Sequence, residues 1–286
     1  MLLGYNTNGL AHHRLTDAIE LLADEGYQSV AITLDAGALD PYDDPEHLAR
    51  QLRAVREALD RRGLNRVVET GARFLLNPRR KHDPTLLDPD PGRRSRRADF
   101  LNRAIDLAVV LGASVVSIWS GSTSTGEPEG VLYARLKQEL GPILDHAAAV
   151  GVVLGFEPEP GMFVDTMERY AELDRRLQHP AFQLTLDIGH VHCLEAEPIP
   201  SVIRTWADRI VNVHLEDMVV GVHQHLPLGA GTIDFPPVLW ALAETGYRGG
   251  VHVELSRQSA EGAQAVAESA AFLRRIWPTG VGQISR

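Results

Sequence analysis

Four short phrases in the second half of the chain each place an acidic residue or a histidine at the end of an apolar run. The phrases are GFE, LDIGH, NVHLED and HVEL, and the residues that they present are Glu157, Asp187, His214 and Glu254. Three carboxylates and one imidazole form a suitable set of ligands for a divalent metal ion. If the ends of the four runs meet in space, the sequence therefore predicts a metal site.

The predicted cofactor is one divalent metal ion, because carboxylate oxygens joined by a single nitrogen are suitable ligands for several such ions. Mn²⁺ is our first expectation, and Co²⁺, Mg²⁺ and Zn²⁺ are alternatives. The order of affinities does not choose among them, since the supply of each metal in the cell also matters. Taken singly, each residue could instead be a solvated loop residue or a member of a structural ion pair.

Short β-rich runs alternate with longer helical patterns eight times along the chain. This rhythm predicts a single (β/α)8 barrel over residues 1–276, followed by a loosely ordered tail over 277–286. An open, doubly wound sheet is the alternative, but its strands would be apolar on both faces. The expected strands are Leu2–Asn6, Ser29–Asp35, Asn65–Glu69, Val115–Ser120, Val152–Glu157, Gln183–Asp187, Ile210–His214 and Val251–Glu254. The expected helices are 14–25, 45–62, 95–111, 131–150, 166–178, 199–207, 236–245 and 260–276.

Polar and apolar residues alternate along these expected strands. In the seventh run, Val211 and Val213 oppose Asn212 and His214. Side chains on a strand alternate with a period of two, so the apolar set faces the helices and the polar set faces the barrel axis. The four candidate ligands share this inward direction at the carboxyl ends of their strands, where barrels of this kind build active sites.

The composition narrows the classes of partner. The 286 residues are 44% hydrophobic and 23% charged, which is ordinary for a soluble globular protein. No apolar run approaches the length of a membrane span, and the N-terminus lacks the pattern of a secretory signal. The single cysteine, Cys193, cannot form an internal disulfide, and we expect a cytoplasmic protein. The net charge of -10 disfavours a broad basic face that binds nucleic acid.

The phrases GFEPEPG, LDIGH, NVHLEDM and LGAGTIDF, followed by GYRGGVHVELS, resemble the xylose-isomerase-like TIM-barrel superfamily. These proteins include sugar (phosphate) isomerases and epimerases, inosose dehydratase and endonuclease IV. The resemblance covers the whole chain, and its specific motifs lie between residues 152 and 256. It implies metal ligands at Glu157, Asp187, His214 and Glu254, and a substrate contact at His190. It also implies a sugar-like small molecule as substrate, and many such barrels form homodimers or homotetramers.

The chemistry expected at such a site begins with a hydroxy-ketone that chelates the metal, which then stabilises the enediolate formed when a neighbouring proton leaves. The resemblance to 3-epimerases implies that Glu157 and Glu254 form the acid–base pair. Return of the proton to the same face gives isomerisation, return to the opposite face gives epimerisation, and loss of a β-hydroxyl group makes the enzyme a dehydratase of an inosose-like or keto-polyol substrate. Glu159 competes with Glu157 for its role, although Pro158 interrupts the strand.

The segment HQHLPLGAG, residues 223–231, carries two further histidines. In endonuclease IV, an Asp-x-His before a Gly-x-Gly turn binds an extra zinc ion; here His225 matches the histidine and His223 replaces the aspartate. A multinuclear zinc site also needs histidines at the third and fourth strand ends, where this chain has Glu69 and Trp119. This departure disfavours an abasic-site nuclease. Three roles stay open for His225: part of a second site, a substrate contact, or a loop histidine hydrogen-bonded to backbone. For the whole protein, a non-catalytic binding barrel is the last alternative.

Residues 70–97 form a long loop and helix start with eight of the 28 basic residues. A loop of this length on the catalytic side of a barrel is usually a lid or a binding element. One or more of Arg73, Arg79 and Lys81 could bind a substrate carboxylate or phosphate. The alternative is a solvated loop whose charges pair with nearby aspartates, and Arg93 to Arg97 are expected at the surface or at a subunit contact. The complete set of expected substrate contacts is His190, His225, Arg73, Glu69 and Trp119.

Overall fold

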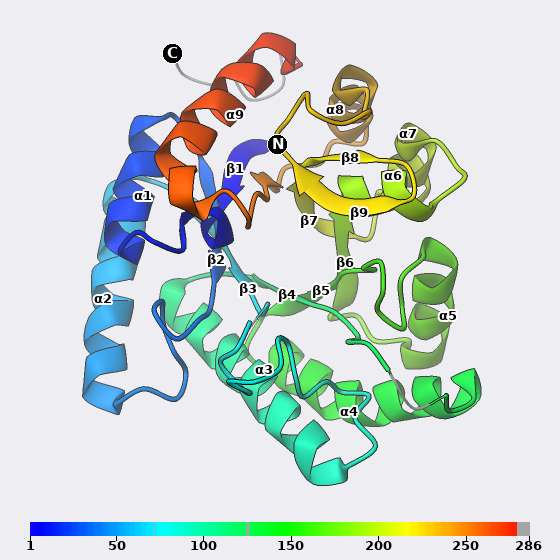
Figure 1. Ribbon diagram of the computed structural model, residues 1–286. Helices are drawn as coiled ribbons and strands as arrows, with labels where there is room; N and C mark the ends of the chain where they lie inside the picture. The colour runs from blue at the N-terminus through cyan, green and yellow to red at the C-terminus, as the bar shows by residue number, and fades with distance from the viewer. Residues whose placement is uncertain (72, 124–125, 279–286) are drawn as a thin grey trace.

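The computed structural model describes residues 1–71, 73–123 and 126–278, which form a closed barrel of parallel strands within a ring of helices (Figure 1). The last barrel strand pairs with the first, which closes the sheet. This closure confirms the predicted (β/α)8 fold and excludes the open sheet. The barrel strands are β1 (Leu2–Asn6), β2 (Ser29–Thr33), β3 (Asn65–Glu69), β4 (Val115–Ile118), β5 (Val153–Phe156), β6 (Phe182–Asp187), β7 (Ile210–Leu215) and β10 (Gly250–Val253).

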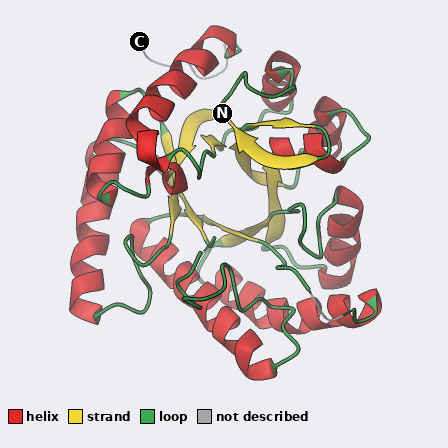
Figure 2. Cartoon of the chain, viewed as in Figure 1, coloured by secondary structure: helices red, strands yellow, loops and turns green. Residues whose placement is uncertain are grey.

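The helices surround the barrel, and the strands form the inner ring (Figure 2). The helix before β4 illustrates how the sequence sets an element's bounds: the Asp90 side chain caps it by accepting from the Gly92 N–H, and Gly112 ends it with a φ of 75°. It therefore begins four residues before its expected start at 95. The outer helices are α1 (Leu15–Asp24), α2 (Pro45–Arg61), α3 (Pro91–Leu111), α4 (Glu129–Ala149), α5 (Met167–Leu177), α7 (Ile199–Thr205), α8 (Phe235–Glu244) and α9 (Gly262–Ile276).

Two elements at the catalytic end were not expected from the sequence. The short helix α6 (Ile188–Leu194) begins directly after β6, and the antiparallel strands β8 (Asp217–Val219) and β9 (Val222–Leu226) form a hairpin after β7. The hairpin lies beside α6 at the barrel rim (Figure 1), and the Gly221 N–H donates to the Cys193 carbonyl at 3.1 Å. Both elements are too short to show a clear hydrophobic period, so the sequence indicated only loops here.

The barrel interior is polar and hydrogen-bonded, as the alternation of side chains predicts. His252 bridges two strands: its Nε2 lies 2.8 Å from Ser29 Oγ and its Nδ1 lies 2.8 Å from Asn212 Oδ1. Asn212 Nδ2 in turn donates to Glu69 Oε1 at 3.0 Å. These four side chains are buried, and their mutual hydrogen bonds replace those that water would make.

Trp277, the first residue of the expected tail, is buried and packs in the hydrophobic core. Residues 279–286 lie outside the described residues, and the expectation for them stays a prediction. Within the described ranges, no helix has both the length and the apolar character that a membrane crossing requires.

The close approach of β1 to the interior network generates a stability prediction. A Cβ atom on Gly4 would lie 2.3 Å from His252 Cδ2, so Gly4→Ala must displace a buried imidazole that holds two hydrogen bonds. We expect the free energy of unfolding, measured by urea denaturation, to fall by about 1–3 kcal/mol. The control is Gly130→Ala in α4, where an added Cβ meets open space and the expected change is below about 1 kcal/mol. Equal stability of the Gly4→Ala variant and the wild type would contradict the packing described here.

Candidate metal centre and substrate pocket

The four candidate ligands meet at the carboxyl ends of β5, β6, β7 and β10. One ligand atom from each of Glu157, Asp187, His214 and Glu254 lies within 4.8 Å of the others. His214 Nδ1 is the common neighbour, at 3.0 Å from Glu157 Oε1, 2.9 Å from Glu254 Oε2 and 4.0 Å from Asp187 Oδ2. The arrangement gathers three carboxylates around one imidazole nitrogen.

The burial of this cluster fits a bound divalent cation. Glu157, Asp187 and His214 are all buried, and Asp187 Oδ2 has no hydrogen-bond partner. A buried carboxylate oxygen without a partner is costly, and a cation is one group that would compensate it. The other oxygen of Asp187 accepts from the His190 N–H at 2.7 Å, which fixes the carboxylate at the start of α6. The donor set is therefore suitable for the divalent ion that the sequence predicts.

The second ring nitrogen of His214, Nε2, contacts two polar side chains of the barrel interior. Glu69 Oε1 lies 2.9 Å from His214 Nε2, and Asn212 Nδ2 lies 3.1 Å from the same atom. Metal-binding histidines commonly donate their other ring N–H to a carboxylate, which orients the ring and raises its basicity. Glu69 was predicted as a substrate contact; it borders the pocket, but one of its oxygens is already engaged with His214 and Asn212. We therefore infer that it positions the imidazole.

A cavity of about 310 Å³ opens above the cluster. Most of its lining is polar or charged, which fits a small polyhydroxylated molecule better than an apolar one. All the predicted substrate contacts border this cavity, together with Lys81, Glu159 and Arg257. The structure thus brings the predicted residues together, while their roles toward a substrate stay predictions.

The predicted substrate-contact residues differ in how far their polar groups already interact within the protein. Arg73 Nη2 donates to the Asn8 carbonyl at 2.8 Å and its Nη1 lies 3.6 Å from Asp35, so its charge is partly satisfied within the protein. His190 Nδ1 lies 3.1 Å from the Pro158 carbonyl. That acceptor fixes the proton on Nδ1, and Nε2 lies 3.2 Å from His223 Nε2.

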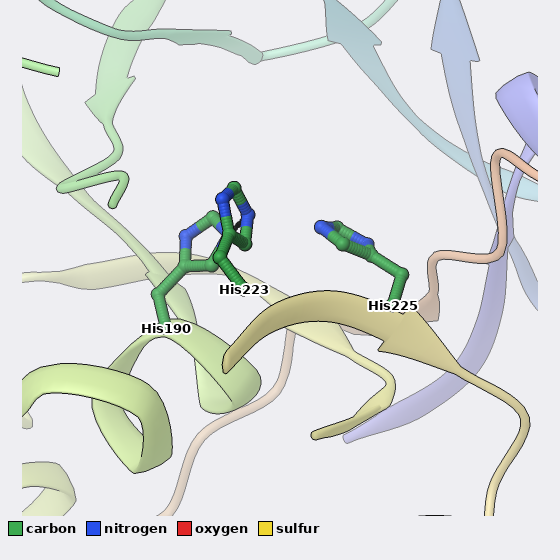
Figure 3. A group of neighbouring side chains, drawn as sticks. All are labelled: His190, His223 and His225. Carbon is green, nitrogen blue, oxygen red and sulfur yellow. Dashed lines mark hydrogen bonds between the residues drawn. The ribbon is translucent and has the colours of Figure 1, made fainter. Parts of the chain in front are cut away.

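Three imidazoles that border the cavity lie near one another (Figure 3). His190 comes from α6, and His223 and His225 come from β9; one ring nitrogen of each lies within 4.8 Å of the others. Burial lowers the pKa of His190 to about 4, so its ring is neutral at neutral pH, and burial also lowers the pKa of His223. His225 Nδ1 lies 3.2 Å from the Glu254 carbonyl, the backbone contact that the sequence left open as one alternative.

Sequence reasoning missed Glu216. Its side chain is completely buried, Oε1 accepts from the Gly189 N–H at 3.0 Å, and the carboxyl also contacts the carboxylate of Asp187. Burial, together with the negative charge of Asp187, raises the pKa of this carboxyl well above its usual range. The signal was present in the sequence, because Glu216 lies two residues after His214 and therefore shares its inward direction.

Sequence reasoning also missed Asn8, which follows β1. Its Nδ2 donates to Glu254 Oε1 at 2.6 Å and so holds the carboxylate that the last barrel strand presents. An asparagine in an N-terminal loop gives no signal of this role until the barrel closes and places β1 beside β10.

The basic loop contains one clear correction. Arg97 was expected at the surface, but it is buried, with its guanidinium 4.5 Å from the centre of the Trp119 ring. The apolar ring stacks on the cation and fixes one wall of the cavity. Arg93 instead pairs with Asp83 and with Asp88, as the solvated-loop alternative expected.

The closed barrel and the buried ligand cluster at its carboxyl-terminal rim define a TIM-barrel protein with a candidate metal centre. Residues 19–276 match the family described as xylose isomerase-like TIM barrel, and the chain belongs to this family. A curated relative is the L-ribulose-5-phosphate 3-epimerase UlaE of Shigella flexneri, which is 25% identical over 201 residues that cover 69% of this chain and 70% of the relative.

Solved structures show the same fold at lower identity. The D-allulose 3-epimerase from Methylomonas sp., in complex with D-allulose, superposes with a TM-score of 0.75 at 17% identity and covers 97% of each chain. The IolI protein with a bound zinc atom gives a TM-score of 0.77 at 20% identity and covers 96% of this chain and 98% of its own. At these identities the two solved structures show that the chain shares their fold.

The contact between Glu69 and His214 generates a prediction for metal affinity. Glu69→Gln removes the negative charge behind the imidazole but keeps the size of the side chain. We expect the dissociation constant for Mn²⁺, measured by competition with a fluorescent chelator, to rise by about 10–100-fold. Glu159→Gln removes a carboxylate from the same cavity but outside the four-residue cluster, and should change the constant little. Equal affinities of the Glu69→Gln variant and the wild type would remove the proposed role of Glu69.

Proposed function

We propose that the protein is a divalent-metal-dependent isomerase or epimerase of a sugar or a related hydroxy-ketone. The observation that carries the proposal is the placement of Glu157 and Glu254, whose carboxylates contact the same nitrogen of His214 beneath a polar cavity. Two carboxylates around one reacting centre can supply both a base and an acid. The names of the distant relatives, which are 3-epimerases of ketoses or of a ketose phosphate, support the same chemistry.

We assign the proton transfers to these two glutamates. One carboxylate takes the proton from the carbon beside the substrate carbonyl, and the C–H electron pair moves into the new double bond. The second carboxylic acid returns a proton to that carbon, from the opposite face in an epimerase. The metal ion, for which Mn²⁺ is our first candidate, acts when bound as a Lewis acid toward the carbonyl oxygen. Asp187 and His214 complete its ligands without taking part in the proton transfer.

We further assign the walls of the cavity to substrate binding. His190 and His225 present imidazoles beside the metal cluster, and Trp119 offers an apolar face to a sugar ring. Arg73 lies at the rim of the same cavity. The substrate is therefore a small sugar-like molecule, and we do not propose a nucleic-acid substrate, because the third and fourth strand ends carry Glu69 and Trp119 rather than zinc-binding histidines.

A dehydratase is the second candidate, and one observation favours it. Glu159 borders the cavity, and burial raises its pKa to about 8, so it carries a proton at neutral pH. A neutral carboxylic acid at that place could protonate a leaving β-hydroxyl group. A product assay separates the candidates, because a dehydratase releases water from an inosose or keto-polyol, whereas an epimerase keeps the formula of its substrate.

The acid–base assignment predicts a specific pattern of isotope exchange. The metal-loaded protein is incubated in deuterated water with a panel of ketoses, ketose phosphates and inososes, and NMR locates the carbon that exchanges its proton. We expect exchange at a single carbon, and a loss of about 10²–10⁴-fold in turnover for Glu157→Gln and for Glu254→Gln. Both variants should keep the circular dichroism spectrum of the wild type.

Two further variants make this experiment decisive. Glu244→Gln, at an exposed site on α8, should retain full exchange. Glu159→Gln tests the competing base: if it abolishes exchange while Glu157→Gln retains it, the assignment of Glu157 is wrong. Full activity of the Glu254→Gln variant would overturn the mechanism.

A further inference from the structure

We propose that Arg97, a buried cation of α3, is a positioning residue for the substrate cavity: it fixes the ring of Trp119 in the orientation that meets a substrate. Trp119 borders the cavity, whereas Arg97 is not among the residues that line it. A substrate contact at Trp119 is part of the proposed function, so the role of Arg97 rests on that proposal. Arg97 would thus control binding from outside the cavity.

The guanidinium of Arg97 is buried without an acidic partner. The residue is 1% exposed, its Nη1 has no hydrogen-bond partner, and no carboxylate of the described residues forms an ion pair with it. Burial lowers the pKa of the guanidinium to about 10, which leaves it positively charged at neutral pH. An unpaired buried charge costs stability, and an apolar side chain of similar size would avoid that cost. A cation at this place therefore indicates a role that an apolar residue could not fill.

Aromatic rings surround the cation where a carboxylate would be expected. The guanidinium carbon lies 4.5 Å from the centre of the Trp119 ring and 5.2 Å from the centre of the Phe100 ring. Such contacts are strongest when water is excluded, and a planar, weakly hydrated guanidinium stacks on a ring better than an ammonium group does. Arg97 Nη2 also donates to the Thr70 carbonyl at 3.1 Å. The side chain therefore contacts the Trp119 ring and the end of a barrel strand at the same time.

The backbone at this place has another support, but the ring depends on Arg97. Thr70 follows β3 and Trp119 follows β4, and these strands pair in the barrel. The Thr70 hydroxyl donates to the Ser117 carbonyl at 2.7 Å, which joins the two strand ends without Arg97. The Trp119 ring is held by the guanidinium and by the His82 ring, which meets it nearly at a right angle at 5.3 Å between centres. Loss of the guanidinium should therefore free the ring before it disturbs the barrel.

The orientation of Trp119 matters because so little of its side chain reaches the cavity. The residue is 7% exposed although it borders the cavity. A small rotation of the ring therefore changes a large share of the surface that a substrate can touch. Loss of Arg97 would weaken substrate binding and leave the carboxylates that carry the proton in place, so KM should change more than kcat.

The first measurement follows the Trp119 ring by fluorine NMR of the full, metal-loaded chain, with fluorotryptophan at its four tryptophans. Trp119→Phe assigns the Trp119 signal. We expect one narrow signal in the wild type, and a shift of that signal when a ketose or ketose phosphate from the isotope-exchange panel binds. The signal should broaden or divide in Arg97→Met. Arg96→Met, the same substitution at an exposed neighbour on α3, should leave the signal unchanged.

The second measurement separates binding from turnover. For the ketose of the panel that exchanges its proton, we expect Arg97→Met to raise KM by about 10-fold and to change kcat by less than about threefold. Arg97→Lys keeps the charge but lacks the planar group, so it should raise KM in the same way, and it repeats the test if Arg97→Met does not fold. Adding Arg97→Met to Trp119→Ala should raise KM no further, because the effects of residues that act through one another are not additive.

Several results would overturn this role of Arg97. They are an unchanged Trp119 signal in Arg97→Met, a wild-type KM in Arg97→Lys, and additive effects of Arg97→Met and Trp119→Ala. An equal loss of Mn²⁺ affinity and substrate affinity in Arg97→Met also overturns it, since the whole site would then be disturbed. If no member of the panel exchanges a proton with the wild type, the proposed function fails, and the Trp119 signal of Arg97→Met still shows whether the guanidinium fixes the ring.

Discussion

The mutual repulsion of buried carboxylates is the constraint on which this site depends. Glu157, Asp187, Glu216 and Glu254 converge at the end of one barrel, and the imidazole of His214 lies between Glu157 and Glu254. Glu157, Asp187 and Glu216 are buried, so water screens their charges much less than it would at the surface. The fold therefore holds together a set of groups that would separate in solution, and cations or protons must compensate them.

The polar core of the barrel gives this arrangement its rigidity. A continuous series of hydrogen bonds runs from Ser29 through His252 and Asn212 to Glu69, which contacts the rear of His214. Each member comes from a different strand, so the orientation of the imidazole depends on the register of half the barrel. A buried polar network destabilises a protein when one of its members lacks a hydrogen-bond partner. Here each of the four side chains is hydrogen-bonded to the next.

Most of the fold and the four-residue cluster could be predicted, because both follow from short-range patterns. Because side chains alternate along a strand, the sequence predicted that the His214 side chain points into the barrel. The eight strand–helix repeats predicted that the sheet closes. The sequence could not show the hairpin, α6 or the burial of Arg97, because these depend on packing between distant segments. Glu216 was missed for a different reason: the expected strand ended at His214, whereas β7 continues to Leu215 and Glu216 follows it directly.

The hairpin β8–β9 is held at its base as well as at its tip, where the Gly221 N–H donates to the Cys193 carbonyl. The Asp217 carboxylate accepts the N–H groups of Met218, Gly229 and Ile233, and this knot joins the hairpin to the loop that leads into α8. The sequence of β9, which carries His223 and His225, can thus vary while the barrel stays the same. Substitutions between Asp217 and Gly229 can therefore change the side chains that this segment presents to the cavity. The barrel strands that carry the other carboxylates would keep their sequence and their packing.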